Sequence, residues 1–485
     1  MSPLPTLTRP PLASSPVLPL LTPSPDRYGL LTDLYQLTMT ACYCGEGLDQ
    51  RPASFELLMR RLPDRYGYAI AMGLTQAIEY LQNLWFTPDQ LDWLQSTGIF
   101  QHAPDRFWAL LKEIPPTGTL FTGTVWALPE GTAVFPHEPL LRIEAPLWQA
   151  QLVETYLLNT LNYQTLIATR AARLRSLVGR DTQLLEFGTR RAFSPQASLW
   201  AARAALAAGF NATSNVLAAM HLGQSPSGTM AHALVMALAA LEGSEDEAFT
   251  AFHHYFPGAP LLIDTYDTIA AVDRLVLRVQ SGESIPAVRL DSGDLVTLSQ
   301  YIRSRLPGTK ILASGDLEEF EIDRLQTAGA SLDGYGIGTK LVTGSPVNGV
   351  YKLVEIDGIP VMKESSGKIT YPGRKQVFRS FAPVTSPPIE VPEEVLVPQF
   401  QSDRLGLMTE LPEVGEIPLL EKVMEGGKWL KSPESIAEIA QRVQGTLASL
   451  PAALRCIHQP DDPPVYLSQD LEDLVKKTRK TGTLW

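Results

Sequence analysis

Short apolar runs alternate with amphipathic stretches through the middle of the chain. Helical periodicity occurs over residues 267–279, 295–306 and 317–328, and the apolar runs between them have the length of buried strands. The last four runs recur about every 25 residues, which is the length of one strand-plus-helix unit. We expect an α/β domain, built either as a (β/α) barrel or as an open doubly wound sheet. The runs are residues 183–187, 261–264, 287–290, 310–313 and 334–338.

The segment before these runs has a mixed pattern. Residues 33–42 have the periodicity of a helix, and residues 53–61 and 123–145 alternate as strands with Pro and Gly turns. Residues 147–177 predict one long helix. The first 26 residues contain eight prolines and neither a helical nor a strand period, which predicts a flexible tail.

The end of the chain contains a second proline-rich stretch, at residues 381–398, which predicts a linker or an irregular strand. Residues 432–450 predict a helix with Ser432 as its cap and Pro433 in its first turn. A chain of 485 residues is too long for one ordinary core. The expected units are a tail (1–26), an N-terminal α+β domain (27–150), an α/β barrel catalytic domain (151–380), and a C-terminal linker and helical segment packing on the N-terminal domain (381–485).

Composition narrows the class of protein. Apolar residues make up 45% of the chain and charged residues 19%, as in soluble globular proteins, and no apolar run reaches the roughly 20 residues that span a bilayer. The net charge of −12 disfavours a nucleic-acid partner, because neutralising phosphates takes surplus Lys and Arg. Three cysteines cannot form a disulfide framework, so we expect a reducing, cytoplasmic location.

Polar residues that a core would not need stand at the ends of four strands or just beyond. Ligands in α/β folds bind where strands end, so these residues are the candidate site. The motifs are EFGTRR (186–191), TSN (213–215) followed by GTMAH (228–232), RLDSGD (289–294) and GIGTK (336–340), with SGD (314–316) as a weaker fifth.

The chemistry of these motifs suits an anion. Arg190, Arg191 and Arg289 could hold phosphate or carboxylate oxygens in bidentate fashion, and Gly336 and Gly338 let the backbone approach an anion closely.

Two further groups could carry the reaction. Asp291 and Asp294 could hold Mg²⁺, which favours oxygen ligands. His232 is the one titratable group of the motifs that changes charge near neutrality or can attack phosphorus.

Each motif also has a structural interpretation. Arg190 and Arg191 could form surface salt bridges, a lone G-x-G is common in turns, and Asp294 could simply cap the following helix. His232 could be a core histidine bound to a carbonyl. The recurrence of such motifs at several strand ends favours one anion-binding pocket.

The same motifs carry a family resemblance. TDLYQLTM (32–39), EFGTRR, GTMAH, RLDSGD and GIGT occur in the order seen in nicotinate phosphoribosyltransferases, and VYKL (350–353) and PG (372–373) continue the match. The resemblance runs from about residue 30 to residue 381. It implies a type II phosphoribosyltransferase: an irregular α/β barrel with a split smaller α+β domain, working as a homodimer with shared active sites. The implied reaction joins nicotinate to phosphoribosyl pyrophosphate, with Mg²⁺ and with ATP as a co-substrate that is hydrolysed.

The resemblance also implies residue roles. ATP would phosphorylate His232, Thr229 and Arg289 would contact nicotinate, and Thr339 would contact the phosphoribosyl donor. Tyr35 would stack on the pyridine ring, from the partner subunit. Asp291 completes the expected catalytic set, and the other substrate-binding residues expected are Phe187, Arg190, Ser214 and Gly338.

Ser214 bears on the choice of substrate. Related nicotinamide enzymes carry an aspartate in the matching segment, and a carboxylate there would repel the anionic nicotinate, whereas Ser214 can donate a hydrogen bond. The alternatives are a nicotinamide or quinolinate phosphoribosyltransferase. More distant ones are a barrel aldolase or isomerase and a ligand-binding protein without activity.

Overall fold

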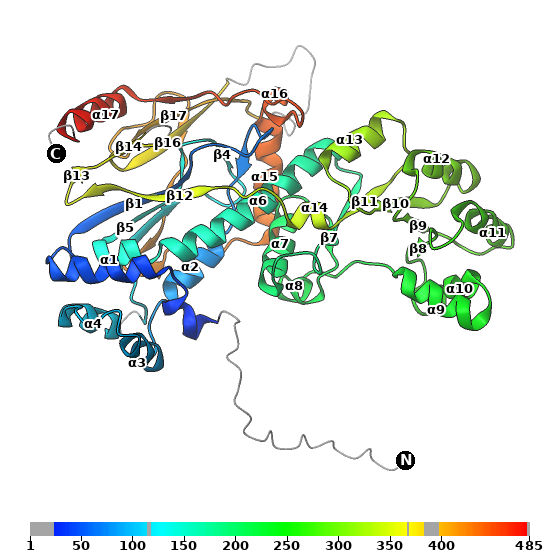
Figure 1. Cartoon of the computed structure of the whole chain (residues 1–485). Helices are drawn as coiled ribbons and strands as arrows, with labels where there is room; N and C mark the ends of the chain where they lie inside the picture. The colour runs from blue at the N-terminus through cyan, green and yellow to red at the C-terminus, as the bar shows by residue number, and fades with distance from the viewer. Residues whose placement is uncertain (1–23, 114–117, 366–367, 383–396, 483–485) are drawn as a thin grey trace, which may run out of the picture.

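Two lobes joined by one long helix make up the protein (Figure 1). This computed structural model describes residues 24–113, 118–365, 368–382 and 397–482. Most of the expected tail at residues 1–26 therefore lies outside the described residues; its end forms a 3₁₀ helix, η1 (Pro25–Leu30). The expected linker at residues 381–398 lies outside them too, apart from its two ends.

A six-stranded parallel sheet forms the core of one lobe. Each of its strands is a predicted apolar run, except the two-residue strand after α7 (Pro195–Ala207). The neighbours in the sheet are hydrogen-bonded in the order β7-β6-β11-β10-β9-β8, and every pair is parallel. The strands are β6 (Gln183–Glu186), β7 (Ala212–Thr213), β8 (Leu261–Leu262), β9 (Ala287–Leu290), β10 (Lys310–Ser314) and β11 (Gly334–Ile337).

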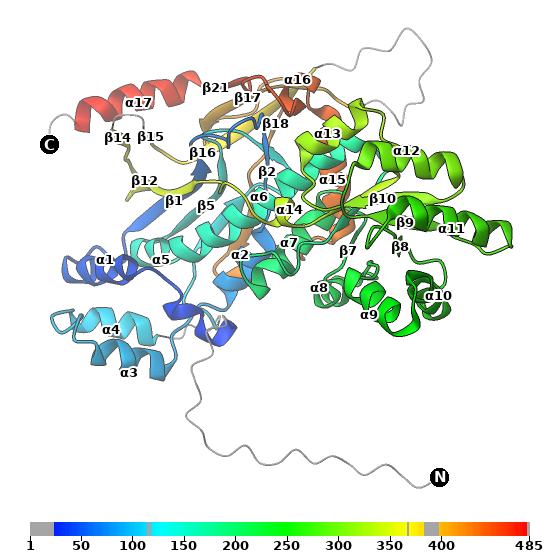
Figure 2. The same cartoon turned by 45° about the vertical axis from the view of Figure 1, so that its right-hand side comes forward.

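The strand order is that of an irregular barrel. Strands that are consecutive in the sequence are neighbours in the sheet, except β7 and β8. Since β11 returns to pair with β6, the ring is interrupted only between β7 and β8. Helices α11, α12 and α13 lie outside the sheet (Figure 2). The helices of this lobe after α7 are α8 (Val216–His221), α9 (His232–Glu242), α10 (Glu245–Tyr255), α11 (Thr268–Gln280), α12 (Leu295–Arg305), α13 (Glu319–Thr327) and α14 (Thr339–Val342).

A seven-stranded antiparallel sheet forms the core of the other lobe, in the order β13-β12-β1-β5-β3-β19-β20. Its strands come from three distant parts of the chain, because residues 349–360 and 421–429 pair with N-terminal strands. The expected limits at 150 and 380 stay predictions, but β12 lies inside the range we assigned to the barrel. The strands are β1 (Pro52–Met59), β3 (Thr124–Ala127), β5 (Pro139–Pro146), β12 (Gly349–Ile356), β13 (Ile359–Pro360), β19 (Glu421–Glu425) and β20 (Lys428–Trp429).

Smaller sheets and helices surround this antiparallel sheet. Among them, four strands pair in the order β18-β16-β17-β21. These elements are α1 (Leu34–Gly45), β2 (Ala69–Ile70), α2 (Leu74–Gln82), α3 (Pro88–Ser96), α4 (Asp105–Lys112), β4 (Ala133–Val134), β14 (Lys363–Ser365), β15 (Lys368–Thr370), β16 (Lys375–Phe381), β17 (Phe400–Leu407), β18 (Glu416–Pro418), β21 (Val465–Leu467), α16 (Ala452–Arg455) and α17 (Gln469–Gly482).

A buried ion pair lies where β16 meets β1. Lys375 Nζ lies 2.8 Å from Glu56 Oε2, and both side chains are completely buried. Lys375 Nζ also donates to the carbonyls of Tyr371 and Gly373. Burial lowers the pKa of Lys375, and the Glu56 carboxylate opposes that shift.

Two helices differ from their predicted limits. The long helix expected at residues 147–177 is divided at Val153, whose ψ of −7° interrupts the hydrogen-bond pattern, into α5 (Leu147–Leu152) and α6 (Glu154–Val178). The helix expected to begin at Ser432 is α15 (Ile436–Ser449), and its cap is Ser435. Ser435 and Glu438 form a reciprocal capping box, which neither Ser432 nor Pro433 can form with that glutamate.

Helix α6 connects the two lobes. Its side chains are buried along most of its length, and the hydroxyls of Thr169 and Thr165 accept hydrogen bonds from the backbone at Ile70 and Met72 of the other lobe. Among the described residues, no helix has both the length and the apolar character to cross a membrane.

Candidate active site

A pocket of about 840 Å³ opens at the carboxyl ends of the barrel strands. It brings together residues from all five strand-end motifs, as expected for ligands of parallel sheets. Of the predicted site residues, its lining contains Phe187, Arg190, Arg191, Ser214, Thr229, Arg289, Asp291, Asp316, Gly338 and Thr339.

The segment before α9 crosses the gap in the barrel between β7 and β8. The backbone N–H of Ser227 donates to Thr213 at the end of β7, and the carbonyl of Met230 accepts from Arg289 on β9. The pocket therefore has a wall of irregular backbone where a regular barrel would have a further strand pair. Thr229 is held on this wall.

Arg289 is the most constrained cation of the pocket. Its Nη1 donates to the Thr229 hydroxyl and, at 3.2 Å, to the Met230 carbonyl, while its buried Nε has no hydrogen-bond partner in the described part of the chain. Burial lowers the pKa of Arg289, and the carboxylates of Asp291 and Asp264 oppose that shift. A buried, unused donor on a cation is a place for an anionic ligand.

Asp291 and Asp264 bring negative charge beside Arg289. Asp291 accepts from the Ser314 hydroxyl, and one of its oxygens lies 3.9 Å from Arg289 Nη2. Asp264 Oδ2 accepts from Asp291 N at 2.8 Å and from Ser292 Oγ at 2.7 Å. The other oxygen of Asp264 is buried without a hydrogen-bond partner among the described residues.

His232 begins helix α9 and faces this acidic pair. Its Nδ1 lies 3.0 Å from Thr265 Oγ1, and its Nε2 lies 3.9 Å from Asp291 Oδ2. The side chain is 38% exposed, so the alternative of a core histidine bound to a carbonyl does not describe it. If Nδ1–H donates to Thr265, the Nε2 lone pair is free at the edge of the pocket.

Glu186 holds the ends of β6 and β7 together. Its side chain is buried, Oε1 accepts from Gly188 N, and Oε2 accepts from the Thr213 hydroxyl. Burial raises the pKa of Glu186 and these two hydrogen bonds oppose the shift. The carboxyl group therefore positions the turn that carries Phe187 and the two arginines that follow.

Two glycines are required by close approaches. A Cβ at Gly336 would lie 2.5 Å from the Phe187 ring, so only glycine lets that ring lie against β11. Gly315 has a φ of +90°, and a Cβ there would lie 2.3 Å from the Asp291 carbonyl oxygen. Asp316 follows with a φ of +46°, a backbone conformation that non-glycine residues adopt mainly at functional turns.

Three of the predicted residues are not among those that line the pocket. His232 lies just outside the lining, where its Nε2 is 3.9 Å from Asp291 Oδ2. Asp294 is the N-cap of α12 and accepts from the backbone N–H of Val296 and Thr297 and from the Thr297 hydroxyl, which is the structural interpretation of that residue. Tyr35 lies on α1, in the other lobe, and is not among the residues that line the pocket. Within one chain, the structure does not bring Tyr35 to the site.

Three residues of the site, Glu186, Asp264 and Thr265, were not expected there from the sequence. Asp264 ends the apolar run at residues 261–264 and Thr265 follows it, which is the same strand-end signal that identified the other motifs. Glu186 lies within a quoted motif, but its role depends on the pairing of β6 with β7.

Family models match three segments of the chain. The nicotinate phosphoribosyltransferase N-terminal domain matches residues 30–162, the nicotinate phosphoribosyltransferase family matches residues 182–316, and the nicotinate phosphoribosyltransferase C-terminal domain matches residues 408–475. The third match covers the region beyond residue 381, where the sequence motifs had ended.

Individual proteins agree with the family models. The chain is 40% identical to a nicotinate phosphoribosyltransferase of Bacillus subtilis, over 92% of this chain and 94% of that protein. It is 42% identical to one of Mycobacterium tuberculosis, over 72% of this chain and 75% of that protein.

Solved structures are similar as well. The structure of human nicotinic acid phosphoribosyltransferase superposes with a TM-score of 0.77 and 28% identity, covering 92% of this chain and all of that one. A nicotinate-nucleotide pyrophosphorylase from Pyrococcus furiosus, at 23% identity and a TM-score of 0.67, covers 87% of this chain and 96% of its own and shares the fold.

Proposed function

This chain belongs to the nicotinate phosphoribosyltransferase family, and we propose that it couples phosphoribosyl transfer to the hydrolysis of ATP through His232. Its reaction is the phosphoribosylation of nicotinate in NAD salvage, with nicotinate mononucleotide and pyrophosphate as products. The observation that carries the proposal is the pocket at the barrel strand ends, where Arg289 keeps an unused buried donor beside Asp291, and Asp291 lies 3.9 Å from His232 Nε2. Because the described cysteines are free, we place the reaction in the cytoplasm.

Nicotinate recognition follows from the charges at one side of the pocket. Arg289 offers a planar fork to a carboxylate, and Thr229, to which it is bound, offers a hydroxyl. Ser214 is neutral, so no acidic group from that position repels the substrate. No observation specifically favours the nicotinamide or quinolinate alternative. Nicotinamide has no carboxylate for Arg289, and the other arginines of the lining, Arg190 and Arg191, suit the pyrophosphate of the donor.

The donor pyrophosphate suits the part of the pocket that the turn after β6 forms. Arg190 and Arg191 are exposed on the turn after β6, and within the described residues neither forms an ion pair. They can stabilise the negative charge that develops on the leaving pyrophosphate, while Gly338 and Thr339 line the adjacent end of β11. The pyridine nitrogen attacks without a base, so catalysis rests on positioning and on charge stabilisation.

Mg²⁺ fits Asp291 with Asp264 better than Asp291 with Asp294, the pair expected from the sequence. Asp264 has a buried oxygen without a partner and lies next to Asp291, and carboxylate oxygens are the ligands that Mg²⁺ prefers. Asp294 uses its oxygens in a helix cap. We therefore propose Asp291 and Asp264 as the residues that would hold the ion, which would neutralise charge on the leaving pyrophosphate.

The phosphoryl transfer to His232 needs one nucleophilic nitrogen. We propose that Nε2 attacks the γ-phosphorus of ATP, which forms an N–P bond and breaks the bond to the β-phosphate oxygen, releasing ADP. Thr265 fixes the ring through Nδ1. Water later hydrolyses the phosphohistidine to inorganic phosphate, and the change in charge beside the pocket in each cycle couples ATP to turnover.

We expect ATP labelled at the γ-phosphate to label the wild-type chain in an acid-labile form, and His232→Ala to abolish that label. Addition of phosphoribosyl pyrophosphate with nicotinate should discharge the label, whereas addition with nicotinamide should not. His253→Ala, which changes a histidine of α10 that is hydrogen-bonded to the Ala259 carbonyl, is the matched control and should label normally. Label retained by His232→Ala would remove this residue from the mechanism, and equal discharge by nicotinamide would contradict the choice of substrate.

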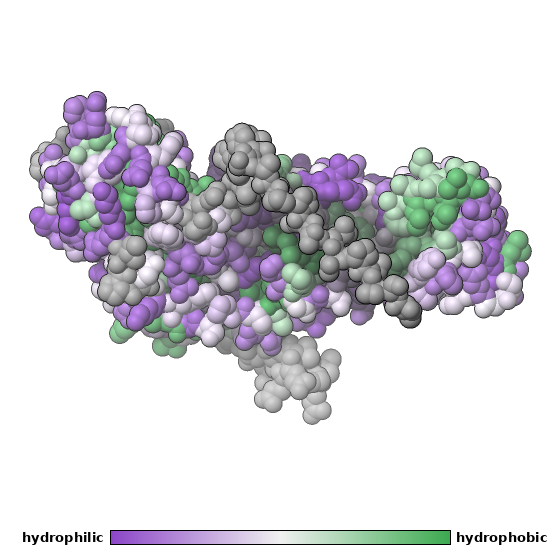
Figure 3. Space-filling view, turned by 90° about the horizontal axis from the view of Figure 1, so that it is seen from below, coloured by the Kyte–Doolittle hydropathy of each residue, from purple (hydrophilic) through white to green (hydrophobic). Residues whose placement is uncertain are grey.

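Two apolar surfaces support a homodimer. One lies at the start of α1, and the other covers α8 and α9, where Figure 3 shows apolar side chains on the face seen from below. In a twofold dimer, the surface at the start of α1 in one chain can pack against the surface on α8 and α9 of its partner. The exposed residues are Leu31, Leu34 and Tyr35 on the first surface, and Val216, Leu217, Met220, Leu234, Met236 and Leu241 on the second.

This pairing would bring Tyr35 of the partner subunit toward the pocket, since α9 begins with His232. The N-terminal lobe of each chain would then complete the active site of the other. Such an arrangement supplies the ring-stacking tyrosine that one chain alone does not bring to its own site.

We expect two inactive variants, Tyr35→Ala and Arg289→Ala, to recover activity when they are coexpressed and purified as mixed dimers. One of the two sites in a mixed dimer would have an intact Arg289 and Tyr35 of the partner subunit, so turnover of nicotinate returns. In the control pair, His232→Ala with Arg289→Ala, each chain lacks a residue of its own active site, so both sites of the mixed dimer should stay inactive. No recovery by the first pair would show that Tyr35 does not act across the interface.

A further inference from the structure

Three arginines surround a second pocket, of about 560 Å³, that lies away from the catalytic site. These residues are Arg175, Arg180 and Arg455, and none of them forms an ion pair with an Asp or Glu that the structure describes. Most arginines in this acidic chain do have such a partner, as Arg203 has Glu130 and Arg404 has Glu416. The second pocket therefore has an uncompensated positive charge.

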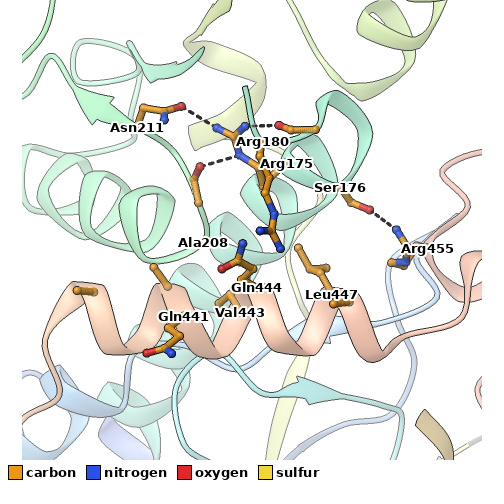
Figure 4. A pocket seen from close by; sticks show the side chains of 15 residues that line it. Arg175, Ser176, Arg180, Ala208, Asn211, Gln441, Val443, Gln444, Leu447 and Arg455 are labelled. Carbon is orange, nitrogen blue, oxygen red and sulfur yellow. Dashed lines mark hydrogen bonds between the residues drawn. The ribbon is translucent and has the colours of Figure 1, made fainter. Parts of the chain in front are cut away.

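The pocket lies at the opposite end of the barrel strands. It is formed by the last turn of α6, the loop at residues 208–211 and one face of α15 (Figure 4). Arg175 Nη1 donates to the Thr182 carbonyl just before β6, and its Nη2 donates to Asn211 Oδ1 just before β7. The catalytic pocket lies at the other ends of these two strands, so the two pockets do not share lining residues.

The three guanidinium groups are held in place by neutral groups. Arg455 donates to Ser176 Oγ and to the Leu450 carbonyl, and Arg180 faces the Gln444 amide, whose oxygen accepts at 2.9 Å when it is turned toward the arginine. Burial lowers the pKa of Arg175, and no carboxylate offsets that shift. Neutral partners fix the orientation of the cations and leave their charge available to a ligand.

The remaining lining is mainly apolar. Ala437, Ala440 and Ala448 present the accessible apolar face of α15, with Val443 and Leu447 largely buried beneath them, and the pocket also contains the amides of Gln441 and Asn211. An inorganic anion would use the arginines but would leave the apolar wall uncovered. A ligand that matches the whole pocket has an anionic group for the cations and a flat apolar part for the wall.

We propose that this pocket binds an organic phosphate of about nucleotide size, with its phosphate between Arg180 and Arg455 and its ring against the alanine face of α15 at Ala437, Ala440 and Ala448. The arginine forks match phosphate oxygens in geometry and charge. The volume lies within the range of about 300–1,000 Å³ typical of small-molecule sites. The site is separate from the catalytic pocket and does not depend on the proposed reaction.

The test is calorimetric titration of the full chain with 5′-AMP and, separately, with inorganic phosphate. We expect Arg180→Ala to weaken AMP binding at least about tenfold, because a hydrogen bond to a charged group contributes roughly 1.5–3 kcal/mol. Arg180→Glu should weaken it further. Arg180 is exposed, so both variants should fold, and thermal unfolding checks this.

Two matched variants separate the possible sites. Arg190→Ala, in the catalytic pocket, and Arg324→Ala, on the surface of α13, should leave the dissociation constant of AMP unchanged. Loss of binding in Arg190→Ala but not in Arg180→Ala would assign AMP to the catalytic pocket and overturn the proposal, as would no binding by the wild type at millimolar AMP. Inorganic phosphate that binds as tightly as AMP would overturn the role of the apolar wall.

Discussion

Arg289→Ala is expected to lower kcat/KM for nicotinate by about a hundredfold to a thousandfold. Truncating one partner of a buried, hydrogen-bonded charged contact costs roughly 2–5 kcal/mol, and each 1.36 kcal/mol is about tenfold in rate. The loss has two sources in this site. In the proposed binding mode the substrate carboxylate loses its cation, and Thr229 with the Met230 carbonyl loses the donor that holds the wall of the pocket.

Steady-state kinetics with nicotinate and phosphoribosyl pyrophosphate check this result. Arg289→Lys keeps the charge but not the fork, so its kcat/KM should fall between those of the wild type and the alanine variant. Arg305→Ala, an exposed arginine paired with Asp273, is the matched control and should be fully active. A loss of less than tenfold in Arg289→Ala would show that nicotinate is bound by other groups.

Lys375→Met is expected to lower the free energy of unfolding of the antiparallel lobe by about 3–5 kcal/mol. The substitution leaves the Glu56 carboxylate completely buried without its cation, and an uncompensated buried charge is far more costly than a buried pair is favourable. It also leaves the Tyr371 and Gly373 carbonyls without their donor. The measurement is the urea midpoint of the first unfolding transition at pH 7.

The double variant Glu56→Gln/Lys375→Met shows whether the unpaired carboxylate or lost packing accounts for the loss of stability. It removes both charges, so it should recover much of the stability that the single variant loses. Equal loss in the single and the double variant would mean that packing, and not the unpaired carboxylate, accounts for the effect.

The strands and helices of the barrel could be predicted because each is a local pattern. Apolar runs such as residues 287–290 and 310–313 became β9 and β10 almost unchanged. Local patterns do not say which strands pair, however. Nothing in the sequence of β12 or β19 indicates that they complete a sheet with β1 and β3, so the split of the smaller lobe came only from the resemblance.

The site, like the fold, could be predicted where its residues form a local sequence motif. Charged motifs such as RLDSGD are visible in the sequence, whereas Asp264 and Thr265 follow a run of only two strand residues and carry no second signal. The metal role of Asp294 stays a prediction, and the structure shows this residue in a helix cap. A helix cap and a metal site use the same residue type. The geometry of the cap distinguishes the two.

The strand order of the antiparallel lobe also sets the timing of folding during synthesis. Its sheet begins with β1 at residue 52 and ends with β20 at residue 429, so the ribosome must make nearly the whole chain before the sheet can close. Until then, the free edge of β3 is exposed to other nascent chains. A message truncated just after residue 340 would encode every arginine of the catalytic pocket and still yield a protein that depends on chaperones and is prone to aggregate.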